Sequence, residues 1–154
     1  MLQIMPNSPE PPDDDLADLF LRTTKRMRRT QSARLSPLGL TPAQARALRV
    51  IGRAAEHGDE PLRMSALADY LGIVPRSATT VVDALAAAGL VTREQDPANR
   101  RATLVTPTEA GRQALTRMFE ARRDAAEEIF SALTPAQRHT LRDLLATLAA
   151  DSPH

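Results

Sequence analysis

The chain has 154 residues, 42% of them hydrophobic and 25% charged, which is the size and composition of one ordinary globular domain. It contains no cysteine, which excludes disulfide bonds, thiolate catalysis, thiol-based redox sensing and cysteine-type zinc sites. The formal net charge of +1 does not decide for or against a polyanionic partner, because a local basic surface can be hidden in the sum.

The beginning of the chain is predicted to be a disordered arm. Residues 1–12 contain four prolines and no apolar periodicity. They also lack a basic segment followed by an apolar run, and the longest apolar run of the chain, 84–91, is far shorter than the ~18 residues of a membrane span. We therefore expect a cytoplasmic protein with no membrane partner.

A first helix is predicted over about 13–35. Three aspartates, Asp13 to Asp15, favour its N-terminus, and apolar positions recur at helical spacing at Leu16, Leu19, Phe20, Thr23 and Met27. Between residues 22 and 34 the helix carries six basic residues and no acid. We interpret them as a solvated face that pairs with acids elsewhere, in preference to a direct DNA contact.

A sequence motif that begins helices occurs three times. Thr41-Pro42-Ala43-Gln44 is a capping box with proline at the first helical position, and Thr134-Pro135-Ala136-Gln137 repeats it. In Thr106-Pro107-Thr108-Glu109 either threonine can be the cap. These segments predict helices over about 42–56, 107–132 and 135–150.

The predicted helix over about 42–56 is expected to bury Ala45, Leu48, Ile51 and Ala55. The one over about 135–150 carries a leucine stripe at 141, 144, 145 and 148.

Two further helices and a β-hairpin are predicted between the helix over about 42–56 and residue 107. Ser65 is predicted to cap a short helix that ends near Gly72, and Pro75 begins another that runs to Ala88. Two β-prone runs, 90–94 and 102–106, then flank a polar turn and predict a hairpin. The fold class is therefore mainly α with a small β-hairpin wing: a winged helix-turn-helix of six helices.

The helix that begins at Pro75 is the predicted recognition helix. Leu67, Ala68 and Leu71 before it, and Ala78, Val81, Val82 and Leu85 within it, are expected to face the core. The residues left on its surface, apart from Asp83, suit entry into the major groove of DNA: Pro75, Arg76, Ser77, Thr79 and Thr80. Taken alone they would be ordinary polar surface, but their position between a glycine turn and a wing favours DNA contact.

The predicted wing carries Asp96, Asn99, Arg100 and Arg101. One arginine can place its guanidinium in the minor groove, while Asp96 braces the other across the loop. Which arginine does which is left open. The alternative is a solvated polar turn with an incidental ion pair.

The recognition helix, the wing and the segments beside them resemble the multiple-antibiotic-resistance (MarR) family of regulators. The resemblance lies in Leu67-Ala68, Leu71 to Val74, Val82 to Leu85, Gly89 to Val91, Asp96 to Arg101, Leu104 to Thr106 and Thr108 to Gly111. It implies a DNA-binding repressor over residues 13–150, with a winged lobe at about 41–106. It also implies a homodimer joined by helices 13–35 and 107–150, bound to a palindromic operator on double-stranded DNA. Release by a small phenolic or lipophilic effector is part of the same expectation.

No enzyme, cofactor or metal is expected. The histidines at 57, 139 and 154 are far apart in sequence, and neither a catalytic set nor a phosphate loop is present. Phe20, Met27 and Met118 are weak candidates for an effector pocket, because core packing explains them more simply. The alternative functions are a helical protein-interaction module, or an activator without a ligand switch.

Overall fold

The computed structural model describes residues 13–58 and 60–150, so the predicted arm lies outside the described residues. The chain divides into two compact units. The lobe comprises residues 33–121, and the helical unit comprises 13–32 together with 122–150.

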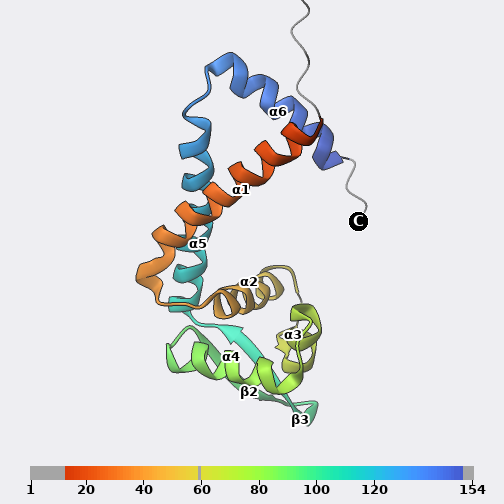
Figure 1. The fold of residues 1–154 in the computed structure, drawn as a ribbon. Coiled ribbons are helices and arrows are strands. Elements are labelled where there is room, and N and C mark those ends of the chain that lie inside the picture. Colours follow the sequence, from red (N-terminus) through yellow and green to blue (C-terminus); the bar gives the residue numbers. More distant parts are fainter. Residues whose placement is uncertain (1–12, 59, 151–154) are drawn as a thin grey trace, which may run out of the picture. The chain divides into compact units, whose positions relative to one another are not determined.

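The predicted six helices and hairpin are confirmed (Figure 1). In chain order the elements are α1 (Asp13–Leu35), a short 3-10 helix η1 (Ser36–Leu38), α2 (Pro42–His57), β1 (Leu62–Arg63), α3 (Met64–Leu71), α4 (Pro75–Ala87), β2 (Val91–Asp96), β3 (Asn99–Pro107), α5 (Glu109–Phe130) and α6 (Pro135–Ala150).

Two helices begin at the predicted capping boxes. At the start of α2 the Thr41 hydroxyl accepts the Gln44 N–H at 3.2 Å, while the Gln44 side chain accepts the Thr41 N–H at 3.0 Å. Thr134 and Gln137 repeat this before α6 at 3.3 and 2.9 Å. Each box satisfies two N–H groups near the helix start, one in the first turn and one on the cap residue itself.

The start of α5 selects one of the two candidate threonines. Thr108 is the cap: its hydroxyl accepts the Gly111 N–H at 3.0 Å and donates to the Gly89 carbonyl at 2.6 Å. Its backbone N–H donates to the Leu90 carbonyl at 3.0 Å, so the first turn of α5 is held against the segment that follows α4.

The prediction that Ser65 caps α3 is wrong. The N-cap is Arg63, two residues earlier, so the helix begins at Met64, and no side-chain hydrogen bond is made at the cap position. The preceding residues pair as a strand, which carries the chain directly into the helix. The predicted end is confirmed: Gly72 adopts a left-handed conformation with φ of 64°, which glycine adopts without steric cost.

The core of the lobe lies between α2, α3, α4 and the sheet. Its largest fully buried side chains are Leu48, Ile51, Leu67, Val82, Leu85 and Val105. All three predicted core residues of α3 are buried, and so are Ala78, Val82 and Leu85 of α4, while Val81 is half-buried.

The buried face of α2 differs from the predicted one. Ala45 is only half-buried and Ala55 is exposed, whereas Ala47 and Gly52 are buried beside Leu48 and Ile51. A side chain at Gly52 would overlap Leu115, so α2 and α5 approach each other closely at this glycine. The close approach turns the buried face of α2 toward Gly52.

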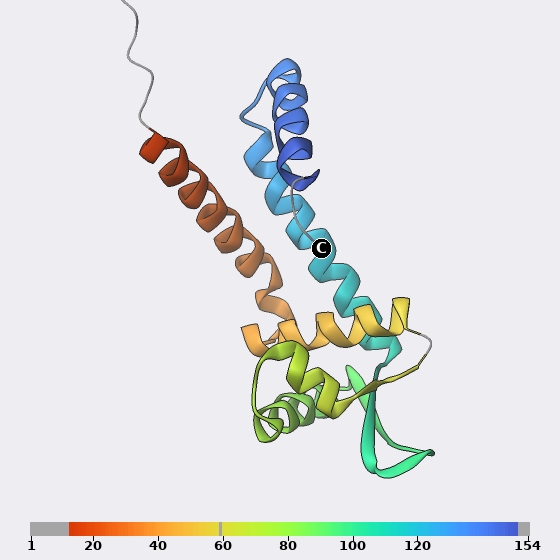
Figure 2. The ribbon, with the colours of Figure 1, turned by 90° about the vertical axis from the view of Figure 1, so that its right-hand side faces the viewer.

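A three-stranded antiparallel sheet completes the lobe, in the order β1-β3-β2. The predicted hairpin is present but longer than expected, because β2 and β3 leave only Pro97 and Ala98 between them. Figure 2 shows it extending beyond the helices of the lobe. The strand β1 was not predicted, since two residues are too few to show a period.

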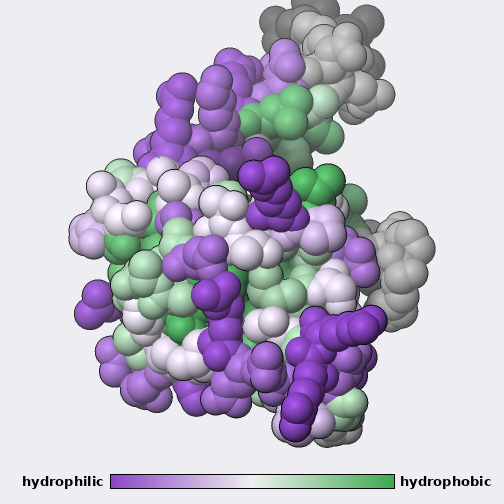
Figure 3. All heavy atoms as spheres, turned by 90° about the horizontal axis from the view of Figure 1, so that it is seen from below, coloured by the Kyte–Doolittle hydropathy of each residue, from purple (hydrophilic) through white to green (hydrophobic). Residues whose placement is uncertain are grey.

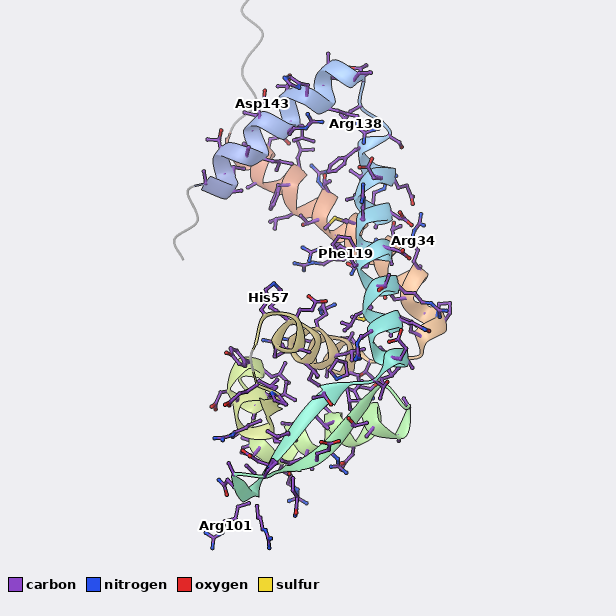
Figure 4. The ribbon with its side chains drawn as sticks, turned by 180° about the vertical axis from the view of Figure 1, so that it is seen from behind. Arg34, His57, Arg101, Phe119, Arg138 and Asp143 are labelled. Atoms are coloured by element: carbon purple, nitrogen blue, oxygen red, sulfur yellow. The ribbon has the colours of Figure 1, made fainter. Side chains whose placement is uncertain are left out.

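The helical unit exposes much of its apolar surface. No residue of α6 is buried, and Leu144 and Leu148 are 59% and 67% exposed. In α1, Leu16, Phe20 and Leu21 are 71%, 59% and 62% exposed. An ion pair between Glu127 and Arg138 links α5 to α6, and Figure 4 shows Arg138 on the side of α6 that faces α5.

We expect Gly111→Ala to destabilise the lobe by about 1–3 kcal/mol, because the added methyl group would overlap the backbone carbonyl of Leu90, which cannot move aside like a side chain. Urea-induced unfolding checks this. Ala110→Ser, at an exposed position next to it, is the matched control and should stay within about 0.5 kcal/mol of the unmodified protein. Equal stabilities for the two variants would contradict the close approach.

Candidate DNA-binding surface

The first turns of α4 form an exposed polar surface. Val74 is the N-cap, and Pro75 occupies the first turn, where its missing N–H leaves no bond unmade. Because one face of α4 is buried in the lobe, the residues predicted for DNA contact all lie exposed: Pro75, Arg76, Ser77, Thr79 and Thr80. The predicted exposure of these residues is confirmed, and their contact with DNA stays a prediction.

Two hydroxyl groups of α4 are already engaged within the helix. Thr79 donates to the Pro75 carbonyl at 3.0 Å, and Thr80 donates to the Arg76 carbonyl at 3.1 Å. With its hydrogen used in this way, each threonine oxygen is left as an acceptor for an outside donor. Arg76 is exposed and makes no ion pair with any residue in the described ranges. The Arg76 guanidinium, which is a donor, and the Thr79 and Thr80 oxygens, which are acceptors, thus lie within two turns of α4.

The register of the hairpin changes near its tip. Pairing runs regularly from Val91–Pro107 to Gln95–Thr103 and then passes directly to Asp96–Asn99. Within the described chain, residues 100–102 of β3 consequently have no pairing residue on β2. Both wing arginines stand on this unpaired stretch, where an irregularity re-aims side chains.

The two Asx residues of the wing bind its backbone. One carboxylate oxygen of Asp96 accepts the Ala98 N–H at 2.8 Å, and the amide oxygen of Asn99 accepts the Arg101 N–H at 3.1 Å. Both are bonds to the residue two positions on, the pattern of an Asx turn. Asp96 and Asn99 therefore shape the tip of the wing, whatever their part in DNA contact.

The predicted brace between Asp96 and a wing arginine is wrong. The other oxygen of Asp96 accepts from Nε of Arg63 at 3.1 Å and lies 2.9 Å from its Nη2. Arg63 belongs to β1 and pairs with Leu104 of β3, so its side chain reaches across β3 to the end of β2. The predicted partner lay in the same loop, whereas the real one is 33 residues away in sequence.

Arg100 and Arg101 are consequently both left to solvent. Both are exposed, and neither makes an ion pair within residues 13–58 and 60–150. Figure 4 shows Arg101 at the tip of the hairpin, directed away from the lobe. Seen from below, long hydrophilic side chains project above a surface of nearly neutral and hydrophobic residues (Figure 3).

A second ion pair links the wing to α4. Arg93 of β2 pairs with Asp83 of α4, and both side chains are about half exposed, at 42% and 52%. Neither Arg93 nor Arg63 is predicted from the sequence, because a lone arginine in a short strand shows no pattern. The only indication was Asp83, the one acid in α4.

The weak effector candidates lie in different environments. Met118 is 3% exposed and packs into the core of the lobe, which supports its interpretation as a core residue. In the helical unit Met27 is half-buried and Phe20 is exposed. An open pocket of about 250 Å³ lies between α5 and α6, lined by Glu127, Phe130, Arg138, Leu141, Arg142 and Leu145, and it includes none of the three.

The basic residues of α1 and the histidines His57 and His139 lie at the surface. The six basic residues of α1 are exposed. His57 lies 3.1 Å from the Arg53 carbonyl, and His139 lies 3.5 Å from Asp143; Figure 4 labels His57 and Asp143. No cluster of three metal-ligating side chains occurs among the described residues. None of the helices described is long and apolar enough to cross a membrane.

Comparison with known proteins gives consistent results. The sequence profile of the MarR family matches residues 38–102. The chain is 30% identical to the HTH-type transcriptional repressor Rv2887 of Mycobacterium tuberculosis over 139 residues. These aligned residues cover 90% of this chain and 96% of that protein. The crystal structure of RV1404 from Mycobacterium tuberculosis is similar with a TM-score of 0.77 and 26% identity, covering 97% of this chain and all of that one.

A third similar structure is a point mutant of MepR from S. aureus bound to an oligodeoxyribonucleotide. It has a TM-score of 0.72 and 16% identity, and it covers 88% of this chain and 96% of that one. At this identity the similarity concerns the fold alone.

Proposed function

The chain belongs to the MarR family of transcription regulators, and on that premise we propose that it represses transcription by binding a palindromic operator as a homodimer, from which a small phenolic or lipophilic ligand releases it. The proposal has three parts: the DNA surface, the dimer and the ligand. Each has its own support in the residues of the chain.

One observation carries the DNA-binding part. The lobe presents two exposed elements that bear arginines, the first turn of α4 and the tip of the wing, and in the described chain none of these arginines is paired with an acid. Cations left without internal partners are available to phosphates and base edges. The fold is also that of the MepR mutant, whose structure contains an oligodeoxyribonucleotide.

The two elements have different tasks in this proposal. The N-terminal part of α4 enters the major groove, where Arg76 bonds a guanine and Ser77 contacts a base or a phosphate. Thr79 and Thr80, whose hydroxyl hydrogens are used within the helix, accept from the amino groups of bases. The narrow tip of the wing enters the minor groove, whose negative potential attracts arginine. Pro75 lies at the edge of the first contact surface and Asn99 at the edge of the second.

Homodimer formation is supported by the uncovered apolar faces of the helical unit. Leu144, Leu145 and Leu148 are 59%, 41% and 67% exposed on α6, and α1 exposes a similar set. In a monomer these side chains would remain in contact with water, whereas a second copy of the chain can bury them. A two-fold dimer also presents two lobes, which matches the two halves of a palindrome.

The ligand part rests on geometry. The two lobes of a dimer must reach half-sites about one helical turn, or ~34 Å, apart, so a modest change in their spacing takes both α4 helices out of register. A ligand shifts this equilibrium only through its preference for one spacing, and moving it from 1:99 to 99:1 requires about 5.5 kcal/mol. The chain has no cysteine to sense an oxidant, and Phe20 and Met27 remain candidates for contact with an apolar ligand.

We expect Arg76→Ala to reduce the preference for the operator over random duplex DNA by about 1–3 kcal/mol, the contribution of a bidentate arginine–guanine pair. Operator sequences are first selected from a pool of random duplexes, and affinities for both kinds of DNA are then measured across a salt series. Arg53→Ala, which removes an exposed arginine of α2, is the control and should leave the preference unchanged. An equal loss on operator and random DNA would make Arg76 a phosphate contact only.

We expect Leu148→Asp to monomerise or unfold the protein, because a carboxylate cannot be buried in an apolar interface without a partner. Analytical ultracentrifugation at micromolar concentration checks this. Ala146→Asp adds the same charge at an exposed position on the opposite side of α6 and should leave the dimer intact. A stable monomer of the unmodified chain under these conditions would refute the dimer.

We expect some phenolic or lipophilic compounds to release the operator complex and to raise the melting temperature of the free protein, since a ligand that binds the folded state stabilises it. A panel of such compounds is titrated while release and melting are followed together. Zinc and peroxide are the controls. Release by either of these, with no organic compound raising the melting temperature, would show that the sensing mode is different.

A further inference from the structure

We propose that Arg63 is a positioning residue of the wing: by holding Asp96 it fixes the tip in the shape that presents both Arg100 and Arg101 to DNA. The inference rests on the proposed DNA binding and adds to it a residue outside the wing. It also assigns both wing arginines to DNA contact, whereas the sequence alone predicts that only one of them enters the minor groove.

The Asp96 carboxylate is the centre of this arrangement. Asp96 is 6% exposed, although the four residues before it in β2 are exposed. One oxygen accepts the Ala98 N–H at 2.8 Å, and the other accepts from Nε of Arg63 at 3.1 Å and lies 2.9 Å from its Nη2. A buried carboxylate requires donors and a compensating charge, and Arg63 supplies the charge.

The pair determines where the tip lies. Arg63 comes directly before α3, on the strand that pairs with β3. Through Asp96 it ties the end of β2 to the start of the helix-turn-helix. Without Arg63, the carboxylate would have to move into water to recover its solvation, and the Ala98 turn bonded to it would move as well.

The same pair explains the freedom of the wing arginines. Asp96 is the acid closest to them in sequence, and its oxygens are occupied by Ala98 and Arg63. Arg100 and Arg101 also stand on the stretch of β3 that is not paired with β2. Both guanidinium groups are therefore available to DNA at once.

Arg63 has an alternative role that must be distinguished. Its side chain is 49% exposed, so it can also contact a phosphate directly. A phosphate contact contributes about 0.9 to the slope of log affinity against log salt, whereas a positioning residue leaves that slope unchanged. The slope and the order of the free tip together separate the two roles.

The test compares Arg63→Gln, Arg63→Lys, Asp96→Asn and the double variant Arg63→Gln/Asp96→Asn, with Arg53→Gln of α2 as the matched control. Amide hydrogen exchange at Ala98 and Arg101 is measured in the free protein, and affinity for duplex DNA across a salt series. If Arg63→Gln does not fold, Asp96→Asn removes the same ion pair with almost no change of shape.

We expect Arg63→Gln and Asp96→Asn each to speed exchange at the tip and to weaken binding about tenfold at an unchanged salt slope, since a disordered tip must be ordered on binding. The double variant should bind no more weakly than the weaker single variant, because both act through one pair. Arg63→Lys should be intermediate, since it keeps the charge but loses the guanidinium fork. Arg100→Gln and Arg101→Gln should each lower the slope by about 0.9 per wing.

Two results would overturn the proposal. One is a fall in slope for Arg63→Gln with unchanged exchange at the tip, which would make Arg63 a phosphate contact. The other is a fall in slope for only one of the two wing arginine variants. Failure of the unmodified protein to bind any duplex would instead refute the proposed function, while exchange in the free protein would still decide whether Arg63 orders the tip.

Discussion

The burial of one face of α4 is the constraint on which the candidate DNA-binding surface depends. Ala78, Val82 and Leu85 are fully buried, and burying a side chain the size of valine or leucine contributes about 1.5–3 kcal/mol. Any rotation of the helix about its axis would expose them, so its orientation in the lobe is fixed. The same packing that stabilises the lobe therefore determines which side chains, Arg76 and Thr80 among them, are directed to solvent.

The wing is held by a different kind of interaction. Between Val91 and Asp96 every residue of β2 is exposed, so hydrophobic burial contributes little to the outer part of the hairpin. Polar contacts take its place: an ion pair to α4 through Arg93, another to β1 through Arg63, and two side chains that bond the backbone of the tip. Such contacts are directional, and they set the shape of the tip more than they stabilise the fold.

The two units of the chain differ in how completely they bury their apolar surface. The lobe encloses a contiguous core with six large side chains that are almost fully inaccessible to water. In the helical unit α6 buries no residue, although its leucines have the spacing of a packing face. A helix of this kind is stable chiefly through its contacts with other helices. This difference is why the candidate DNA-binding surface can be described within one chain, whereas the proposed dimer interface requires a second.

Features that depend on neighbouring residues were determined by the sequence alone. The Thr-Pro-Ala-Gln segments located the starts of α2 and α6, Gly72 located the end of α3, and helical periodicity identified the buried face of α4. The exposed residues of α4 and the adjacent wing arginines were found in the same way. All these features rest on hydrogen bonds or periods that span at most a few residues. Only the tertiary structure decided the partner of Asp96, the two-residue strand β1 and the changed register of the hairpin. Arg63 and Asp96 are 33 residues apart, and a contact between distant residues leaves no local pattern in the sequence.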